Sequence, residues 1–284
     1  MNKNLIIILC LNVAFGITSF EFPTHPINLG KWNGGSAITS PYQQINPASI
    51  KMSSNILIAS FKIPEDINIQ SLEYSKLFNN NLLKLNTSII DYGQLMDFIT
   101  ENEFSARDII IGISTKTIYK NLISVGLKVN YLNSKIDSWN QQSSKWTLGF
   151  RAHLLDKRLG LGLAYNRFFQ QNEIEELMNQ SQYILGSFYK PLYFPGTIAI
   201  DLIKKNSKWS GILSIEINMR ENISASIGFN SDKFNYQADT IISDVFYGLG
   251  AGIIVNLKGI DLSIGIRNSG QTGSITGISI GKEL

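Results

Sequence analysis

Polar and apolar residues alternate without a break in Lys145-Trp146-Thr147-Leu148-Gly149-Phe150-Arg151-Ala152-His153-Leu154. The even-numbered residues are apolar, and the odd-numbered residues are polar, charged or glycine. A period of two residues is the period of a β-strand, whose successive side chains point to opposite faces of the sheet. One face of this strand therefore suits lipid and the other suits water.

The same alternation recurs along most of the chain. It predicts fourteen strands, with approximate cores at 55–62, 69–77, 82–90, 105–115, 121–131, 143–154, 159–167, 181–190, 196–204, 209–217, 222–230, 243–256, 259–267 and 273–281. Bacterial outer-membrane barrels have an even number of strands, short periplasmic turns and longer outer loops. The long polar connections 91–104, 132–142, 168–180 and 231–242 are therefore expected outside the cell.

A soluble β-sandwich also alternates, so the residues of the polar face decide between the two folds. These are mainly Gly, Ser, Asn and Thr with scattered charges, which suits a crowded lumen better than a surface in bulk water. Aromatic residues gather near the expected strand ends, as in the belts at membrane interfaces: Trp139, Tyr165, Phe168, Phe169, Tyr189, Tyr193, Phe194, Trp209 and Tyr236. The sequence thus predicts an all-β, transmembrane antiparallel barrel in the lipid bilayer of a bacterial outer membrane.

Composition excludes several other classes. Charged residues make up 17% of the 284 residues, and the formal net charge is +3. No cluster of Lys and Arg forms the basic patch that nucleic-acid binding requires. Beyond Gly16, no apolar run approaches the 18 residues of a transmembrane helix.

The first 54 residues differ from the rest. Residues 1–16 have the pattern of a secretory signal peptide: Lys3, an apolar run to Ala14, and a small-x-small ending at Gly16. Cys10 leaves a lipoprotein signal as the alternative, but it lies too close to the start of the chain. Residues 17–54 contain four prolines, which disfavour a membrane strand, and backbone at membrane depth must pack inside protein or line water. We therefore expect an N-terminal hatch at 17–54 and the barrel at 55–284.

Two blocks of sequence resemble the PorV/PorQ family, which belongs with the fatty-acid transporter FadL in one outer-membrane superfamily. The first contains Phe20-Glu21-Phe22, Gly34-Gly35-Ser36-Ala37 and the triplet Asn46-Pro47-Ala48. The second contains Asp91-Tyr92-Gly93 followed by Glu103-Phe104-Ser105-Ala106-Arg107-Asp108. The chain departs from the family at Ser40-Pro41-Tyr42-Gln43, where an acidic residue is usual, and at its non-aromatic end Gly281-Lys282-Glu283-Leu284.

The resemblance implies a 14-stranded barrel whose N-terminal hatch, marked by Asn46, Pro47 and Ala48, folds into the lumen. It also implies a role as a partner-binding or cargo-binding component of a type IX-like protein secretion system. The partners would be other secretion-system proteins or secreted cargo. Aromatic residues in the expected outer loops would be the anchors for such a partner: Phe98, Phe104, Phe234 and Tyr236.

The alternative function is a FadL-like transporter of small hydrophobic molecules. The alternation points a set of polar residues into the lumen: Lys128, Lys145, Arg151, His153, Asp201, Glu216, Asp261 and Arg267. Such a wall disfavours an apolar conduit, so the sequence favours the binding role.

Catalysis finds little support. The two histidines, His25 and His153, lie in no metal-ligand or catalytic-triad spacing. The run Gly248-Leu249-Gly250-Ala251-Gly252 imitates part of a nucleotide fingerprint, but no helix is expected after it. We therefore predict a protein that is not an enzyme and has no cofactor or metal.

Overall fold

The computed structural model describes residues 19–96, 103–120, 122–137, 139–154, 157–170, 180–232, 247–268 and 273–284. The expected signal peptide 1–16 lies outside these residues, as do the loop aromatics Phe98, Phe234 and Tyr236.

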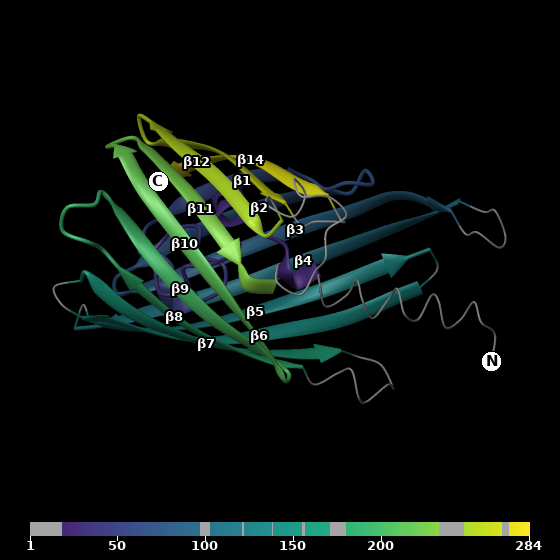
Figure 1. The fold of residues 1–284 in the computed structure, drawn as a ribbon. Helices are drawn as coiled ribbons and strands as arrows, with labels where there is room; N and C mark the ends of the chain where they lie inside the picture. The colour runs from purple at the N-terminus through teal and green to yellow at the C-terminus, as the bar shows by residue number, and fades with distance from the viewer. Residues whose placement is uncertain are drawn as a thin grey trace.

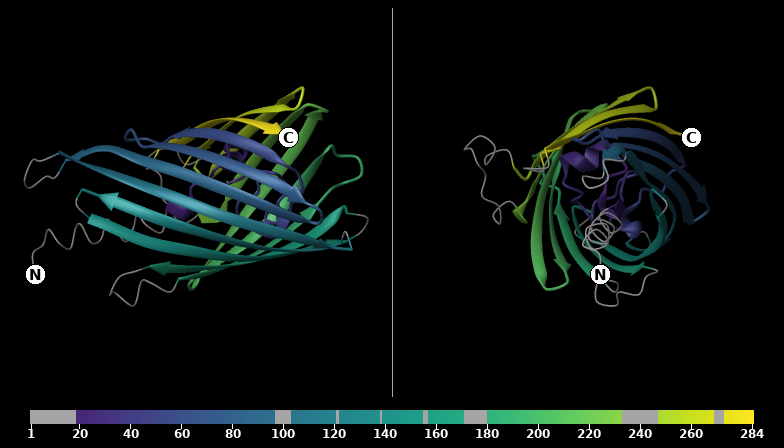
Figure 2. Two further views of the ribbon diagram at one scale, coloured as in Figure 1. Left: turned by 180° about the vertical axis from the view of Figure 1, so that it is seen from behind. Right: turned by 90° about the vertical axis from the view of Figure 1, so that its right-hand side faces the viewer.

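In this part of the chain, fourteen antiparallel strands form one closed barrel (Figures 1 and 2). Each strand pairs with its neighbours in the sequence, and β1 pairs with β14, so the sheet has no open edge. This confirms the predicted antiparallel barrel of fourteen strands. The strands are β1 (Asn55–Lys62), β2 (Asn68–Phe78), β3 (Asn81–Met96), β4 (Glu103–Tyr119), β5 (Ile123–Ile136), β6 (Trp139–Leu154), β7 (Leu159–Gln170), β8 (Ser181–Tyr189), β9 (Gly196–Lys205), β10 (Lys208–Arg220), β11 (Ile223–Asn230), β12 (Leu249–Leu257), β13 (Ile260–Asn268) and β14 (Ser274–Glu283).

The strands differ in length around the barrel. β3 to β6 have 16, 17, 14 and 16 residues, whereas β11 to β14 have 8, 9, 9 and 10. About 9–11 residues are enough to cross the hydrocarbon core. The outer ends of β3 and β4 project past the rest of the rim in both side views (Figures 1 and 2).

These long strands correct the expected loops 91–104 and 132–142. β3 continues to Met96 and β4 begins at Glu103, while β5 and β6 leave only residues 137 and 138 between them. Outside the bilayer no lipid requires apolar side chains, so this part of the ladder is polar and looks like a loop in the sequence. Its backbone pairing continues nonetheless, and the side chains of Arg107 and Asp91 form an ion pair of 3.1 Å across β3 and β4.

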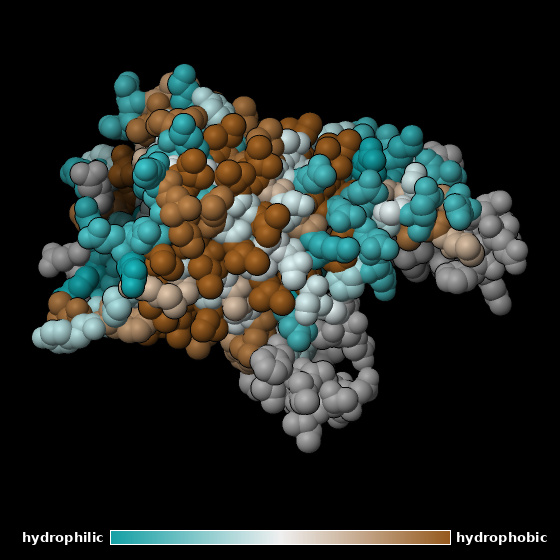
Figure 3. Space-filling model, turned by 90° about the horizontal axis from the view of Figure 1, so that it is seen from above, coloured by the Kyte–Doolittle hydropathy of each residue, from teal (hydrophilic) through white to brown (hydrophobic). Residues whose placement is uncertain are grey.

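Large apolar side chains cover the outside of the barrel. Along β6, Leu148 is 55% exposed while Arg151, on the opposite face, is 4% exposed. In the space-filling view, a band of apolar residues runs between more polar ends (Figure 3). This band is the surface expected to contact lipid, and the protein is a multi-pass β-barrel of the bacterial outer membrane.

The N-terminal segment, residues 19–54, lies within the ring of strands, as the view along the barrel shows (Figure 2). It contains the 3₁₀ turns η1 (Ser19–Glu21) and η2 (Pro47–Ser49) and the short helix α2 (Pro26–Gly30). α2 packs against β12 and β13, and η2 packs against β5 and β6. No helix among the described residues is long and apolar enough to span a membrane.

Candidate functional site in the barrel lumen

Asp201, which points inward from β9, binds the backbone of the N-terminal segment. Its carboxylate accepts hydrogen bonds from the backbone N–H of Gly35 at 2.5 Å and of Ser36 at 3.0 Å, and from the Ser36 hydroxyl. Asp201 is fully buried, so these donors replace the water that a carboxylate otherwise requires. The Gly34-Gly35-Ser36-Ala37 block of the sequence therefore contacts the wall directly.

The Asn46-Pro47-Ala48 triplet forms the start of η2 against β5 and β6. The Asn46 side chain accepts a hydrogen bond from the Ala48 N–H at 3.0 Å and donates one to the Phe150 carbonyl at 3.1 Å. A Cβ atom at Gly126 of β5 would lie 2.5 Å from the Pro47 carbonyl carbon, so only glycine allows this close approach. Asn46 thus links the turn to the wall.

Cationic side chains of the wall donate to backbone carbonyls of the same segment. Arg151 Nε donates to the Ala37 carbonyl at 2.6 Å, and Lys116 Nζ donates to the Ile50 carbonyl at 2.5 Å. In the reverse direction, Lys31 of the segment forms an ion pair of 3.4 Å with Glu216. Many of the polar groups of the lumen are therefore occupied in holding residues 19–54.

The other residues expected to face the lumen also lie on its side of the sheet. Lys145 is 5.1 Å from the Phe168 ring centroid, and the Arg267 guanidinium is 4.9 Å from that of Trp32. The rings of His153 and Phe188 pack edge to face at 5.9 Å. Lys128 Nζ lies 3.5 Å from the Gln44 carbonyl.

A second polar network surrounds His25, the residue before α2. The His25 ring stacks on Tyr42 with centroids 3.7 Å apart, and the Tyr42 hydroxyl donates to Asp261. His25 Nδ1 accepts the Ile27 N–H at 3.1 Å and caps the helix. Burial, together with the charges of Lys31 and Lys84, holds the pKa of His25 well below 6.5. His25 is therefore neutral while the segment is in place.

The outer end of the lumen is apolar. Phe20 of the segment packs there with side chains from the ends of several strands, and its ring centroid is 6.1 Å from that of Phe168. We call this group the outer apolar cluster; its buried members are Phe20, Leu29, Ala59, Phe61, Ile63, Ile69, Ile90, Tyr92, Ala106, Ile110, Leu132, Phe168 and Ile275.

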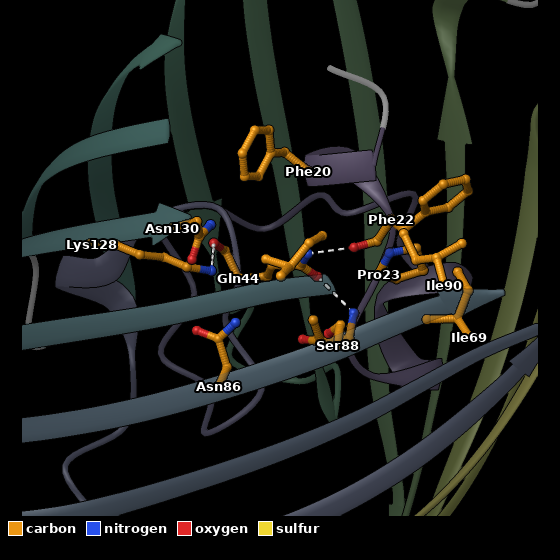
Figure 4. Close-up of a pocket in the computed structure, with 12 residues that line it drawn as sticks. Phe20, Phe22, Pro23, Gln44, Ile69, Asn86, Ser88, Ile90, Lys128 and Asn130 are labelled. Atoms are coloured by element: carbon orange, nitrogen blue, oxygen red, sulfur yellow. Dashed lines mark hydrogen bonds between the residues drawn. The ribbon is translucent and has the colours of Figure 1, made fainter. Parts of the chain in front are cut away.

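A small cavity separates this cluster from the polar lumen (Figure 4). Its volume is about 20 Å³, room for about one water molecule. Phe20, Phe22 and Ile90 contribute apolar groups to its lining, and Lys128 and Gln44 contribute polar groups. Three buried oxygens of its wall have no hydrogen-bond partner within the described residues: Asn86 Oδ1, Ser88 Oγ and Asn130 Oδ1.

Sequence reasoning missed Glu73 as a site residue. Glu73 is buried on β2, forms an ion pair of 2.7 Å with Lys84, and accepts a hydrogen bond of 2.7 Å from the Thr24 hydroxyl. The sequence signal for Glu73 was its position between the apolar residues Leu72 and Tyr74. Because these two neighbours point outward, alternation places Glu73 in the lumen.

Phe104 does not lie in an outer loop. It belongs to β4, where it pairs with Leu95 of β3, and it is partly buried. The reason is the extension of β3 and β4 beyond the bilayer, which turns the expected loop into paired strand. Phe98, Phe234 and Tyr236 lie outside the described residues.

Comparisons with protein-family models and with curated proteins found no match. Solved structures do match, and they share the outer-membrane β-barrel fold. The CymD monoaromatic hydrocarbon channel aligns with a TM-score of 0.63 at 11% identity, over 92% of this chain and 97% of that chain. A TodX monoaromatic hydrocarbon channel mutant aligns with a TM-score of 0.60 at 11% identity, over 92% and 99%.

A FadL homologue from Pseudomonas aeruginosa aligns with a TM-score of 0.52 at 10% identity, over 92% of this chain and 98% of that chain. At such low sequence identities, these matches show only that the folds are similar. It agrees with the FadL-like part of the expected resemblance and gives no support to PorV/PorQ or to type IX secretion. The structures named here are of channels and a transporter homologue, not of enzymes.

Proposed function

We propose that this protein is an outer-membrane channel for small hydrophobic molecules, obstructed by its own N-terminal segment. The outer apolar cluster carries the proposal, because it places a continuous set of buried apolar side chains at the end of the lumen that faces the outside. The two similar channels described as conducting monoaromatic hydrocarbons support it. This is the transporter alternative that the sequence left open.

The polar lumen, which disfavoured this function in the sequence, has another role. Arg151 and Lys116 bind carbonyl groups of the N-terminal segment, and Asp201 binds its N–H groups. These polar side chains therefore hold the segment in place. They do not form the surface that a substrate entering from outside would contact first.

A hydrophobic molecule that enters from outside would be stopped at the small cavity beside Phe20 and Lys128. A volume of about 20 Å³ does not admit an aromatic hydrocarbon, so transport requires the segment to move. A hydrophobic molecule that enters the outer apolar cluster would compete with Phe20 and Phe22 for the same apolar surface. Displacement of these side chains would then open the route along the segment.

The secretion role rests on the outer loops, and the loop 231–242 lies almost wholly outside the described residues. No feature of the described lumen favours it.

Uptake of radiolabelled toluene into cells that lack other hydrophobic-molecule channels tests the proposal. Ile110 lies in the outer apolar cluster, and its neighbour Ile109 points to lipid and is 37% exposed. Ile110 also lines the small cavity, so Ile110→Trp adds bulk where a hydrophobic molecule would enter and should reduce uptake several-fold. The matched control Ile109→Trp should leave uptake unchanged. Wild-type uptake no faster than in cells without the protein, or equal effects of the two variants, would overturn the proposal.

A further inference from the structure

Two amide oxygens converge inside the barrel above Gly112. Asn86 of β3, Gly112 of β4 and Asn130 of β5 are neighbours in one register row, and all three positions face the lumen. A Cβ atom at Gly112 would collide with Asn86 Oδ1 and with Asn130 Oδ1, so both oxygens point into the space that the glycine leaves open. Asn86 is 6% exposed and Asn130 is 5% exposed. The row therefore presents two buried acceptors to the same space.

These two oxygens have no hydrogen-bond partner in the described part of the chain, and the same holds for Ser88 Oγ, two residues further along β3. All three residues line the small cavity of about 20 Å³ (Figure 4). A buried polar atom without a partner is destabilising, because it has lost its hydrogen bonds to water. The cavity therefore needs a hydrogen-bond donor that the described residues do not supply.

The charge beside the cavity restricts the kind of donor. Lys128 also lines the cavity, and its ammonium group, which carries three N–H donors, lies 3.5 Å from the Gln44 carbonyl. This ammonium would repel a cationic ligand, whereas an anionic ligand would face the amide oxygens of Asn86 and Asn130. A neutral hydroxyl group avoids both conflicts, because it can donate to an amide oxygen and accept from Lys128.

The surroundings of the cavity indicate what carries this hydroxyl group. A volume of about 20 Å³ holds one group the size of a water molecule. Phe20, Phe22 and Ile110 contribute apolar groups to the same lining. The Phe20 ring packs 6.1 Å from the Phe168 ring, as an aromatic pair does. When the N-terminal segment moves, an aromatic ring attached to the hydroxyl could therefore take the place of the Phe20 ring.

We propose that this cavity recognises the hydroxyl group of a small phenol, so that phenols such as p-cresol are the preferred substrates of the channel. The hydroxyl donates a hydrogen bond to Asn86 or Asn130 and accepts one from Lys128, while the ring replaces Phe20 in the outer apolar cluster. This inference rests on the proposed function as a channel for small hydrophobic molecules. It narrows their class to neutral aromatic molecules that carry one hydroxyl group.

Equilibrium dialysis of radiolabelled p-cresol against the purified whole protein in detergent tests the site, with empty micelles as the blank. The comparison compound is p-xylene, which has the same shape but a methyl group in place of the hydroxyl. The wild type should bind one p-cresol saturably. After correction for partition into micelles, unlabelled p-cresol should displace it at a several-fold lower concentration than p-xylene. Phe20→Ala should bind p-cresol more tightly, because an apolar space is then already open for the ring.

Asn86→Leu and Asn130→Leu each remove one acceptor at similar side-chain volume. Each should weaken the binding of p-cresol by about threefold to tenfold, which corresponds to the loss of one hydrogen bond. The matched control is Asn133→Leu, because Asn133 lies three residues along β5 from Asn130, on the outward face of the strand, and does not line the cavity. This control should bind p-cresol like the wild type.

If a variant fails to assemble, as judged by heat-modifiable migration, the ligands decide. The ether p-methylanisole keeps the oxygen but lacks the O–H, so it should displace p-cresol from the wild type no better than p-xylene does. Equal displacement by p-cresol and p-xylene, or equal losses in Asn130→Leu and Asn133→Leu, would show that the cavity holds only water and overturn the inference. Toluene uptake by cells is measured separately: uptake without a preference for phenols overturns only this inference, and absence of uptake overturns the proposed function.

Discussion

Glu73 and Lys84 form a buried ion pair, in which both side chains are at most 5% exposed. Glu73→Gln keeps the acceptor for Thr24 but leaves the Lys84 charge without its partner. We expect this change to lower the free energy of unfolding by about 3–5 kcal/mol, the usual cost of breaking such a pair from one side. Urea unfolding in lipid vesicles, followed by tryptophan fluorescence, measures it.

The control for this prediction is Glu73→Gln combined with Lys84→Met. Removal of both charges should restore most of the lost stability, because no charge is then left buried without its partner. Equal stability of the single variant and the wild type would show that water, not Glu73, solvates Lys84.

Leu148 tests the lipid-facing side of the sheet. Arginine at this position, near the middle of the bilayer, should cost about 2–4 kcal/mol and impair assembly. Leu192→Arg is the matched control, because Leu192 lies in the connection between β8 and β9 and is 69% exposed. Heat-modifiable migration of the purified proteins reports assembly, and similar folded fractions would contradict the assignment of Leu148.

At the scale of single residues, the alternation of polar and apolar side chains was enough to place residues such as Lys128, Arg151 and Asp201 on the inner face of the barrel. Their hydrogen-bond partners were not predictable. These partners are backbone groups of residues 35–50, and this segment has no regular alternation of polar and apolar residues from which its course could be inferred. Tyr42 was missed for the same reason: its contact with Asp261 joins positions 219 residues apart in the sequence. Phe104 was misplaced because paired strand above the membrane has the composition of a loop.

The N-terminal segment is the element on which conduction depends. Deletion of residues 20–50 should leave an inserted barrel, because the strand pairing from β1 to β14 uses none of these residues. The deletion should also remove the residues that fill the lumen. Planar-bilayer recordings should therefore show a markedly higher single-channel conductance, and an unchanged conductance would mean that the segment does not obstruct the pore.

His25 should make the docking of the segment in the lumen depend on pH. When the segment leaves the lumen, the pKa of His25 returns to about 6.5, whereas in place it is held well below that value. Below about pH 6.5 only the displaced form takes up the proton, so stability of the docked form is complete above this pH and falls by up to about 1.4 kcal/mol per unit of acidification. Conductance should rise between pH 7.5 and pH 5.

His25→Asn should abolish this pH dependence, because Asn caps a helix start but does not titrate. His153→Asn, which changes the other histidine, should retain it. If both variants respond to acid like the wild type, the response belongs to carboxylates of the lumen.

At the scale of the whole molecule, the orientation of the barrel can be checked with single cysteines. The natural sequence has one cysteine, Cys10, within the expected signal peptide. Glu65→Cys, in the connection between β1 and β2, should react with a membrane-impermeant maleimide on intact cells. Lys258→Cys, in the turn between β12 and β13, should react only after the outer membrane is opened. The reverse pattern would invert the assigned topology.

The number of strands and their order were predictable because every crossing must alternate between lipid and lumen. β1 begins at Asn55 and β10 at Lys208, each within a residue of its expected start. Lengths were less predictable in β3 to β6, where the alternation of apolar residues stops at the membrane surface but backbone pairing does not. The unequal height of the rim is therefore a property that only the three-dimensional structure shows.

Closure of the barrel through β1 and β14 should set the order of events during folding. The pair Asn55 and Glu283 joins positions at nearly opposite ends of the chain, and contacts of such long separation carry the largest entropic cost of chain closure. This pairing should form late, after the neighbouring hairpins. Residues 19–54 directly precede β1, so the N-terminal segment must enter the ring before it closes or thread in through one end afterwards. The slowest step of refolding should therefore be the pairing of β1 with β14, and the segment must enter the lumen before or after that step.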